Sequence, residues 1–159
     1  MATEVVFRRM RDSDLAQVME LEQTCYSTPW SETTFRGLLR RNDCDLLIAT
    51  ADGELWGYAV VWSVADQGEL GNLATTPMRR RQGIGRKLLE AAIDAAARRG
   101  VNELFLEVRV SNHVARALYD AYDFREVGRR RNYYAAPVED ALVLCKRLGV
   151  AEEGEGQKT

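Results

Sequence analysis

The chain has 159 residues, of which 46% are hydrophobic and 29% charged, and it carries a formal net charge of −2 at pH 7. This length accommodates one domain with a buried core, and the composition is that of an ordinary soluble globular protein. The near-balance of charge excludes a protein that coats nucleic acid through its bulk charge, so any basic function must be local.

The sequence also limits the compartment and the metal content. The N-terminus is charged from Glu4 onward and has no apolar segment like that of a secretory signal, and no window approaches the roughly 18 apolar residues of a membrane span. Cys25, Cys44 and Cys145 are odd in number and far apart, which favours reduced, mostly buried thiols over a disulfide framework. One histidine and no close cysteine pair argue against a structural zinc site. We expect a cytoplasmic protein with no metal.

The first third of the chain predicts a strand followed by two helices. The segment TEVVFRRM (3–10) predicts the strand. Asp12 or Ser13 is expected to cap a helix whose apolar residues follow at helical spacing, namely Leu15, Val18, Met19 and Leu21. The segment 27–41 then supplies a turn at its proline and a weak capping box, Ser31-x-x-Thr34, before a second, short helix.

The middle of the chain predicts three strands and a longer helix. The segment 45–64 indicates two strands joined at Asp52-Gly53, the strongest hairpin signal in the chain. A short strand follows within 68–77 and is stopped by its proline. A helical pattern then runs over 83–99 and is ended by Gly100. The expected apolar face of that helix consists of Ile84, Leu88, Ala91, Ala92 and Ala95.

The last third predicts a strand, a helix and two closing strands. The segment 101–110 alternates, with Leu104, Leu106 and Val108 on one face and Phe105, Glu107 and Arg109 on the other. The segment 111–124 predicts a helix whose shared face consists of Val114, Ala117, Leu118 and Ala121. Closing strands are expected near 125–134 and 140–148, and the polar residues 149–159 predict a disordered tail.

The order of these elements is β-α-α-β-β-β-α-β-α-β-β. It predicts a single mixed α/β domain over residues 1–148, built on one central β-sheet. Strands with apolar residues on both faces indicate that helices cover both sides of this sheet.

A segment rich in glycine and arginine, MRRRQGIGRKLLEAA (78–92), begins the longer helix. Gly83 and Gly85 lack a Cβ atom, so a ligand can approach the backbone where the N–H groups of a helix start favour an anion. The surrounding basic residues add charge for phosphate oxygens. The segment is neither a Walker A loop nor a full G-x-G-x-x-G fingerprint, and a basic turn before an ordinary amphipathic helix explains it equally well.

The motif Arg80-Arg81-Gln82-Gly83-Ile84-Gly85 resembles the (Q/R)-x-x-G-x-(G/A) motif of the GNAT superfamily, the Gcn5-related N-acetyltransferases. The order of elements from residue 4 to about residue 148 also resembles the GNAT fold. The resemblance implies that this loop, with Arg86, wraps the pyrophosphate of acetyl-coenzyme A (acetyl-CoA). It further implies that the preceding strand holds the acetyl-pantetheine arm through Leu73, Ala74 and Thr75. Asn112 matches a family position that hydrogen-bonds the cofactor, and it is also expected to cap the following helix.

Four segments resemble a narrower branch of the superfamily, the RimI-like enzymes that acetylate the N-terminal alanine of a bacterial ribosomal protein. The segments are TPWSETTF, RRQGIGRKLLE, LFLEVRVSNHVARALY and the pair RRNYY and EDALVL. The resemblance implies an Nα-acetyltransferase that uses acetyl-CoA and acts on an N-terminal alanine or another small first residue. The implied partner is a small-subunit ribosomal protein.

Two residues match catalytic positions of that branch. Glu107 matches the base that removes a proton from the amine through water, a modest task because an α-amino group has a pKa of about 7.7–8.0. Tyr119 matches the tyrosine that protonates the departing thiolate. From the residues alone, Glu107 is also explained as a solvated strand carboxylate or a partner for Arg109, and Tyr119 as an aromatic side chain packed against the sheet.

A route through an acetyl-cysteine is the competing mechanism. The cysteines lie outside the motif segments, and the only histidine, His113, adjoins none of them in sequence. Direct attack of the amine in a ternary complex is therefore favoured, and His113 is expected to be an exposed helix residue.

Trp30, Tyr133 and Tyr134 lie in segments that resemble those flanking the RimI peptide channel. Aromatic side chains there are suited to pack a short first side chain, and the acidic Glu139 and Asp140 to hold a basic peptide. Ordinary packing explains each aromatic residue equally well. The basic run 129–131 offers either a contact to ribosomal RNA or solvated charge, and we do not expect a nucleic-acid partner.

The chain departs from the family at Asp123, where a glycine normally ends the helix in a left-handed conformation, and we expect a small cost in stability. Two other functions stay open. One is a GNAT enzyme for lysine side chains or small amines, and the other is a non-catalytic acyl-CoA-binding module. Nothing in the sequence indicates an obligate oligomer, so we expect a monomer.

Overall fold

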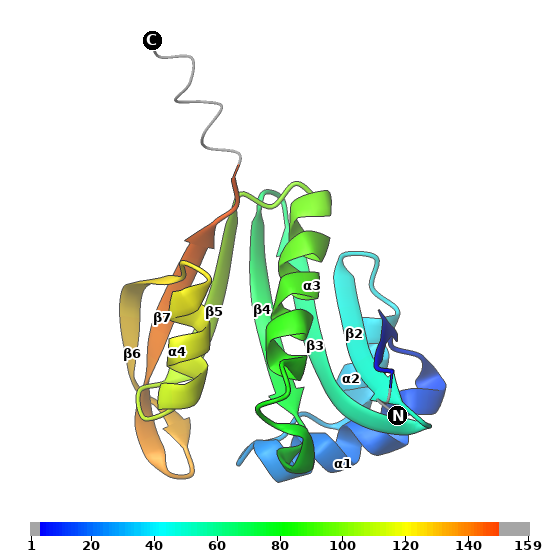
Figure 1. The fold of residues 1–159 in the computed structure, drawn as a ribbon. Coiled ribbons are helices and arrows are strands. Elements are labelled where there is room, and N and C mark those ends of the chain that lie inside the picture. The colour runs from blue at the N-terminus through cyan, green and yellow to red at the C-terminus, as the bar shows by residue number, and fades with distance from the viewer. Residues whose placement is uncertain (1–3, 150–159) are drawn as a thin grey trace.

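The computed structural model describes residues 4–149. In this part of the chain, seven strands form one sheet in the order β1-β2-β3-β4-β5-β7-β6, with four α-helices packed on it (Figure 1). The strands are β1 (Val6–Arg9), β2 (Cys44–Ala51), β3 (Glu54–Val64), β4 (Gln67–Thr75), β5 (Glu103–Arg109), β6 (Arg125–Ala135) and β7 (Val138–Arg147). The helices are α1 (Leu15–Cys25), α2 (Glu32–Leu39), α3 (Ile84–Arg98) and α4 (His113–Ala121). The predicted α/β class and the order of the elements are confirmed, while the tail predicted at 149–159 lies, from residue 150 on, outside the described residues.

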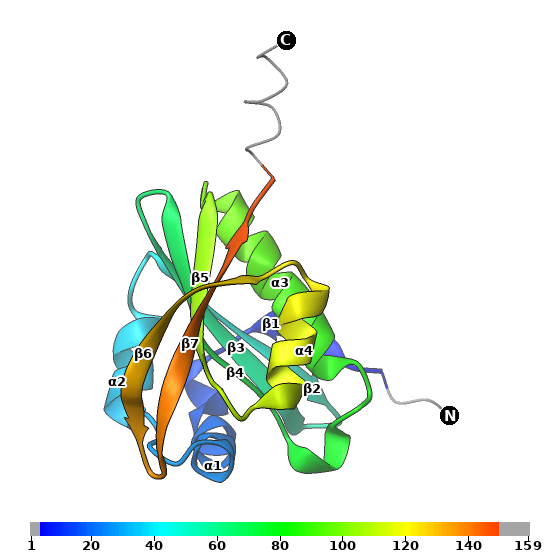
Figure 2. The ribbon, with the colours of Figure 1, turned by 90° about the vertical axis from the view of Figure 1, so that its left-hand side faces the viewer.

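Helices cover both faces of the sheet, as predicted. α3 and α4 lie on one face, and α1 and α2 lie on the other (Figure 2). Because successive side chains of a strand point to opposite faces, the central strand β3 serves both sides. Its Ala59 and Val61 join the cluster under α3, whereas Tyr58 and Val60 join the cluster under α1 and α2.

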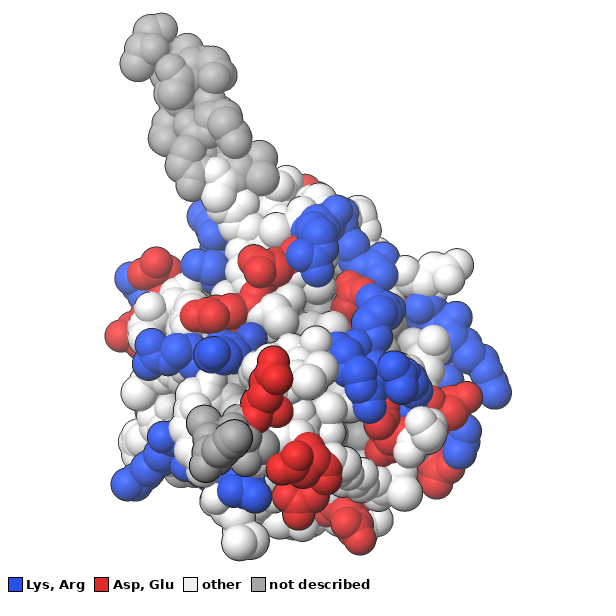
Figure 3. Space-filling model, turned by 45° about the vertical axis from the view of Figure 1, so that its right-hand side comes forward, with Lys and Arg blue, Asp and Glu red and all other residues white. Residues whose placement is uncertain are grey.

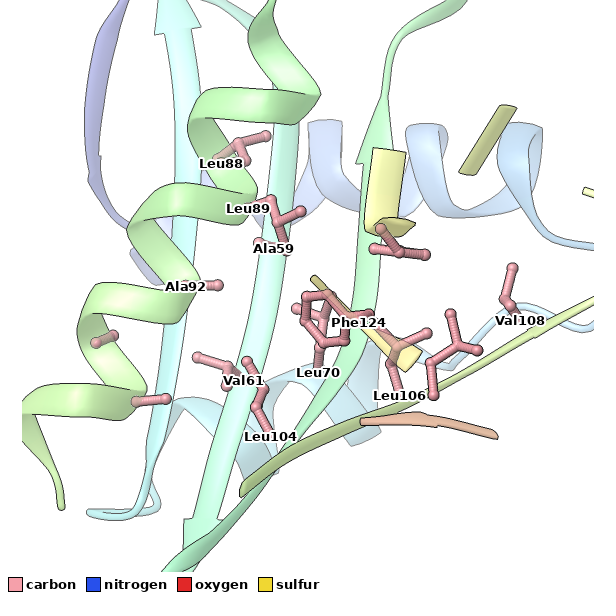
Figure 4. Close-up of a cluster of buried hydrophobic side chains, with 14 of the residues drawn as sticks. Ala59, Val61, Leu70, Leu88, Leu89, Ala92, Leu104, Leu106, Val108 and Phe124 are labelled. Carbon is pink, nitrogen blue, oxygen red and sulfur yellow. The ribbon is translucent and has the colours of Figure 1, made fainter. Parts of the chain in front are cut away.

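The cluster under α3 is the larger of the two hydrophobic cores (Figure 4). Leu88 and Leu89 of α3 are fully buried against the sheet, and Leu104 and Leu106 of β5 belong to the same cluster. Each fully buried leucine contributes about 1.5–3 kcal/mol relative to an exposed one. The helix that carries the glycine-rich segment is therefore firmly fixed to the strands on which the site is built.

Three local signals read from the sequence are confirmed. Asp52 and Gly53 have φ values of 54° and 77°, the pattern of a two-residue type I′ hairpin turn. The Ser31 side chain accepts a hydrogen bond from the Thr34 N–H at 3.1 Å and so caps α2. Asp123 has a φ of 69°, the left-handed conformation that the family gives to glycine.

The predicted cap of the first helix is wrong. Asp12 and Ser13 lie in a short 3-10 turn, and α1 begins only at Leu15. The carboxylate of Asp14 instead accepts from the Arg11 N–H at 2.7 Å and from the Arg8 guanidinium at 2.9 Å. A tertiary ion pair with β1 thus selects which acidic residue organises this turn.

The predicted buried face of α4 is wrong for three of its four residues. Val114 is 84% exposed, and Ala117 and Ala121 are exposed as well. The helix instead packs through the parallel set Ala115, Leu118, Tyr119 and Tyr122. Both sets have the same helical spacing, and the one with two aromatic rings has more apolar area to bury.

The sheet splits between β4 and β5. These parallel strands pair only over Gln67–Glu69 and Glu103–Phe105. Beyond that point β4 continues along β3 and β5 along β7, so the two strands diverge (Figure 1). Backbone N–H and C=O groups on the facing edges then have no sheet partner and need another one.

The charged surface carries both signs. On the face shown in Figure 3, one large group of basic side chains has acidic side chains beside it, and smaller groups of both signs lie elsewhere on the face. Arg9 and Arg99, for example, both bind the Asp45 carboxylate, at 2.8 and 2.6 Å. No helix within residues 4–149 has the length and apolarity needed to cross a membrane.

Candidate active site

A cavity of about 760 Å³ opens where β4 and β5 separate. Its walls come from the segment between α1 and α2, from β4 and β5, from the start of α4 and from the end of β6. The predicted site residues that line it are Trp30, Leu73, Glu107, Asn112, Tyr119, Tyr133 and Tyr134. Ala74, Thr75 and the segment 80–86 do not line it. Ala74 and Thr75 are the last two residues of β4, and the segment 80–86 leads into α3.

Glu107 faces this cavity from β5. Its carboxylate accepts a hydrogen bond from Nε of Arg130 on β6, and its side chain is 18% exposed. The alternative that Glu107 pairs with Arg109 is wrong, because Arg109 binds Glu139 at 3.1 Å and stacks 4.3 Å from the ring centre of Tyr134. Arg130 binds Oε2 of Glu107, and the Tyr133 phenol lies within hydrogen-bonding reach of the same carboxylate.

Tyr119 reaches the cavity from α4. Its side chain is only 7% exposed, and its ring packs edge-on against Phe124 with ring centres 5.6 Å apart. Burial raises the pKa of the phenol, which therefore keeps its proton at neutral pH. The packing role considered from the sequence is present, and the same side chain also lines the cavity.

Asn112 lies between β5 and α4. Its side-chain oxygen accepts from the Ala115 N–H at 3.1 Å, which confirms the predicted N-cap. The same residue lines the cavity. His113, the first residue of α4, is exposed as expected.

The free edge of β4 is occupied by a residue that the sequence did not single out. The Tyr26 hydroxyl donates to the Leu73 carbonyl oxygen at 3.1 Å and accepts from the Leu73 N–H at 3.2 Å. Leu73 is one of the residues predicted to hold the pantetheine arm. Its backbone N–H and C=O are both bonded to the Tyr26 phenol, and Tyr26 also lines the cavity. A ligand that accepts a hydrogen bond from the Leu73 N–H has to replace Tyr26 there.

The start of α3 fits a phosphate-bearing ligand. Gly83 precedes the helix with a φ of 82°, and the first hydrogen bond across this end runs from the Lys87 N–H to the Gly83 carbonyl at 3.1 Å. The N–H groups of Ile84, Gly85 and Arg86 therefore have no partner in the helix. A Cβ atom on Gly83 would meet nothing within 4 Å, so space is open over this backbone.

Arg80 differs from the other members of this loop. Its guanidinium donates to the Thr75 carbonyl at 3.2 Å and contacts the Cys25 sulfur at 3.4 Å. It braces the loop against the end of β4 instead of extending over the helix start. Arg81, by contrast, is exposed and adopts a left-handed conformation with a φ of 68°.

Aromatic side chains form the wall nearest α2. Trp30 packs against Phe35 and Trp62 with ring centres 5.4 and 6.2 Å apart. Gly71 makes this possible, because a Cβ atom there would lie 2.9 Å from the Trp30 ring and would also collide with Trp62. Trp30 is thus both a packing residue and part of the cavity wall.

The two predicted tyrosines form the opposite wall. Tyr133 and Tyr134 meet edge-on with ring centres 5.1 Å apart. The nearby Glu107 carboxylate raises the pKa of the Tyr133 phenol, and burial raises the pKa of Tyr134 to about 12. Both phenols are therefore neutral hydrogen-bonding groups at physiological pH.

Glu22 is a buried carboxylate that the sequence did not single out. It is 1% exposed and accepts from the Tyr58 hydroxyl, from Asn72 at 2.8 Å and from the Trp30 N–H at 2.8 Å. Burial raises the pKa of its carboxyl group. A signal was present, since Glu22 follows Val18 by four residues and so occupies the apolar face of α1.

The three cysteines are free, as predicted. Cys44 and Cys145 are buried, and Cys25 lines the cavity, a placement that the sequence did not indicate. Burial raises the pKa of the Cys25 thiol, which makes it a poor nucleophile at neutral pH.

The basic run 129–131 lies on β6, the edge strand of the sheet. Arg130 binds Glu107, and Arg129 lies 3.5 Å from the Asp140 carboxylate. Arg130 is therefore the member of the run that contacts a residue of the cavity, and Arg131 is exposed.

Comparison with known sequences gives a consistent family. Residues 15–124 match the acetyltransferase (GNAT) family. The chain is 42% identical over 135 residues to a Salmonella typhimurium protein named [ribosomal protein bS18]-alanine N-acetyltransferase, covering 84% of this chain and 90% of that protein. It is 39% identical over 138 residues to the Escherichia coli K12 protein of the same name, covering 86% and 93%.

Solved structures agree with this. The crystal structure of the ribosomal-protein-S18-alanine N-acetyltransferase from Escherichia coli superposes with a TM-score of 0.83 at 36% identity, covering 91% of this chain and 94% of that one. A chain of the NatC complex bound to Gag peptide and CoA superposes with a TM-score of 0.80 at 27% identity, covering 91% and 99%.

Proposed function

Because the chain belongs to the GNAT family of acetyltransferases, we propose that it transfers an acetyl group from acetyl-CoA to the N-terminal alanine of a ribosomal protein. The observation that carries this proposal is the meeting of Glu107 and Tyr119 in one cavity at the split of the sheet. Relatives covered almost from end to end carry the same substrate in their names. We further propose that the reaction takes place in the cytoplasm and that the enzyme acts as a monomer.

Acetyl-CoA, when bound, supplies an activated thioester. We assign its pyrophosphate to the start of α3, where Arg81, Gln82 and Arg86 add polar and charged side chains to the free N–H groups of residues 84–86. We assign the pantetheine arm to the end of β4, at Leu73, Ala74 and Thr75, where Leu73 lines the cavity that Asn112 also lines. Arg80 supports this loop through its contact with Thr75.

Glu107 is the proposed proton acceptor. An α-ammonium group must lose a proton before it can attack, and its pKa of about 7.7–8.0 demands only a mild base. Arg130 holds Oε2 of Glu107 in place, and the residue lines the cavity. This geometry suits removal of a proton directly or through one water molecule.

Tyr119 is the proposed proton donor to the leaving sulfur. Because burial raises its pKa, the Tyr119 phenol is protonated at every physiological pH, but it is a weak acid. Position therefore matters more than acidity, and the packing against Phe124 fixes the ring. Trp30, Tyr133 and Tyr134 enclose space next to Glu107 that suits a small first side chain.

The test is release of free thiol from acetyl-CoA with peptides beginning Ala-Arg and with the same peptides blocked at the N-terminus. Turnover only with the free α-amine is the expected result. Turnover with blocked, lysine-containing peptides would assign the enzyme to lysine acetylation, where the amine pKa of about 10.4 demands far more of the base. Tight acetyl-CoA binding without any turnover would indicate a binding module.

A further inference from the structure

Glu69 is a second carboxylate at the centre of the site. It lies on β4 opposite Trp62 of β3 and Phe105 of β5, in the last residue pair before β4 and β5 separate. Its half-buried side chain lines the main cavity together with Glu107. It also lines a neighbouring groove of about 400 Å³ between β3, β4 and β5, so it stands where the two spaces join.

The two carboxylates differ in their partners. Glu107 is bound by Arg130, whereas Glu69 makes no hydrogen bond or ion pair with any of the residues that the structure describes. Burial and the negative charge of Glu107 both raise the pKa of Glu69, and Arg130 acts in the opposite direction. A half-buried carboxylate with no cation of its own is costly unless a ligand supplies one.

The charges around this point are complementary to one cation. Two carboxylates face a single guanidinium, which leaves a net charge of −1 next to the cavity. A protein N-terminus enters as an α-ammonium group below its pKa of about 7.7–8.0. Its nitrogen has to come within reach of Glu107 to lose the proton, and that brings it into the field of Glu69.

We infer that Glu69 binds the α-ammonium group of the incoming protein N-terminus and so selects free N-termini for the reaction. This inference rests on the proposed function and adds the group that recognises the substrate charge. Glu69 forms the ion pair that holds the cationic substrate, and Glu107 removes the proton. Binding and proton removal are thereby divided between two carboxylates on adjacent strands.

The matched variants are Glu69→Gln and Glu103→Gln. Glu103 lies on β5, on the same face of the sheet as Glu107, and it lines neither cavity. KM and kcat are measured with two free peptides, one beginning Ala-Ala and one beginning Ala-Arg. Glu69→Gln is expected to raise the KM of both peptides about tenfold with kcat changed less than about twofold. Glu103→Gln is expected to change neither.

An equilibrium measurement separates recognition from folding. In the presence of coenzyme A, the wild type is expected to bind the free peptide more tightly than its Nα-acetylated form, and Glu69→Gln is expected to lose this preference. An unchanged peptide KM, or a KM increase confined to the Ala-Arg peptide, would overturn the inference. In the second case Glu69 would instead contact the second side chain.

These outcomes are distinct from failure of the proposed function. If the wild type requires a free α-amine but Glu69→Gln behaves like Glu103→Gln, the proposed role of Glu69 is refuted and the proposed function is not. If the wild type acetylates blocked lysine peptides, the proposed function falls, and the KM of Glu69→Gln for that ε-amine then decides the role of Glu69 separately.

Discussion

The Tyr26 hydroxyl bridges the two backbone groups of Leu73, with oxygen–oxygen and oxygen–nitrogen distances of 3.1 and 3.2 Å. β4 would otherwise present these groups to the split in the sheet. One side chain from the end of α1 thus satisfies the backbone that we assign to the pantetheine arm.

The Tyr26→Phe variant tests this competition. Removal of the hydroxyl frees both Leu73 groups for the ligand, and each net hydrogen bond is worth about 0.5–1.5 kcal/mol. We expect the KM for acetyl-CoA to fall about threefold to tenfold. Steady-state kinetics at saturating peptide measure it. A higher KM would mean that Tyr26 itself helps to hold the arm.

The Glu107→Gln variant tests the base. An amide of the same shape cannot accept a proton, so kcat should fall about 100-fold or more, while acetyl-CoA binding stays unchanged. Glu126→Gln on the exposed part of β6 is the matched control and should retain full activity. A Glu107→Gln enzyme with wild-type kcat would remove Glu107 from the mechanism.

The Tyr119→Phe variant tests the proton donor. The ring still packs against Phe124, so the protein should fold normally, while kcat should fall by about 10- to 100-fold. Tyr122→Phe, directly after the same helix, is the control, because Tyr122 does not line the cavity and its phenol binds Glu90 at 2.5 Å. Equal kcat values for the two variants would show that the Tyr119 hydroxyl has no part in the reaction.

The Gly85→Ala variant tests the phosphate site. A Cβ atom at this helical position would lie 3.4 Å from Thr75 Oγ1, an ordinary contact, so stability should hold or rise because alanine favours a helix by about 1 kcal/mol. The added methyl group should nevertheless obstruct the ligand and raise the KM for acetyl-CoA. Gly37→Ala in α2, where nothing lies within 4 Å, should raise stability without any effect on KM. Melting curves measure the stability of the two variants, and acetyl-CoA titrations measure the KM of each.

Glu22 predicts a specific dependence of stability on pH. Its pKa in the folded protein is raised above the ordinary 4.5 because it is buried, so ionisation costs the folded state more than the unfolded state. The stabilisation from Glu22 is complete below about pH 4.5 and is lost as the pH rises through the folded pKa.

The difference in free energy of unfolding between wild type and Glu22→Gln isolates this effect. It should shrink as the pH rises from 4 toward 7. Other carboxylates, such as Asp14 and Asp45, have lowered pKa values and act in the opposite sense, but they cancel in this difference. Chemical denaturation at several pH values measures it, and a difference independent of pH would contradict the assignment.

Periodicity and turn chemistry alone determined the order of the elements, the hairpin at Asp52-Gly53 and the helix start at Gly83. These features depend on residues close together in the chain, whose spacing and φ preferences act locally. The motif resemblance added Glu107, Tyr119 and the loop before α3, because those residues belong to contiguous segments. Tertiary structure then brought Glu107 and Tyr119 to one cavity.

Tertiary structure alone decided the partners of these residues. The sequence offered Arg109 for Glu107, but the pairing of β6 with β7 brings Arg130 there instead. The sequence offered Asp12 or Ser13 as the cap of the first helix, whereas in the structure Asp14, bound by Arg8 of β1, organises the turn before it. Tyr26 and Glu69 gave no signal at all, because their roles come from the separation of β4 and β5. That separation depends on the register of β4 and β5, whose paired residues lie 36 positions apart in the chain, and no local pattern encodes this register.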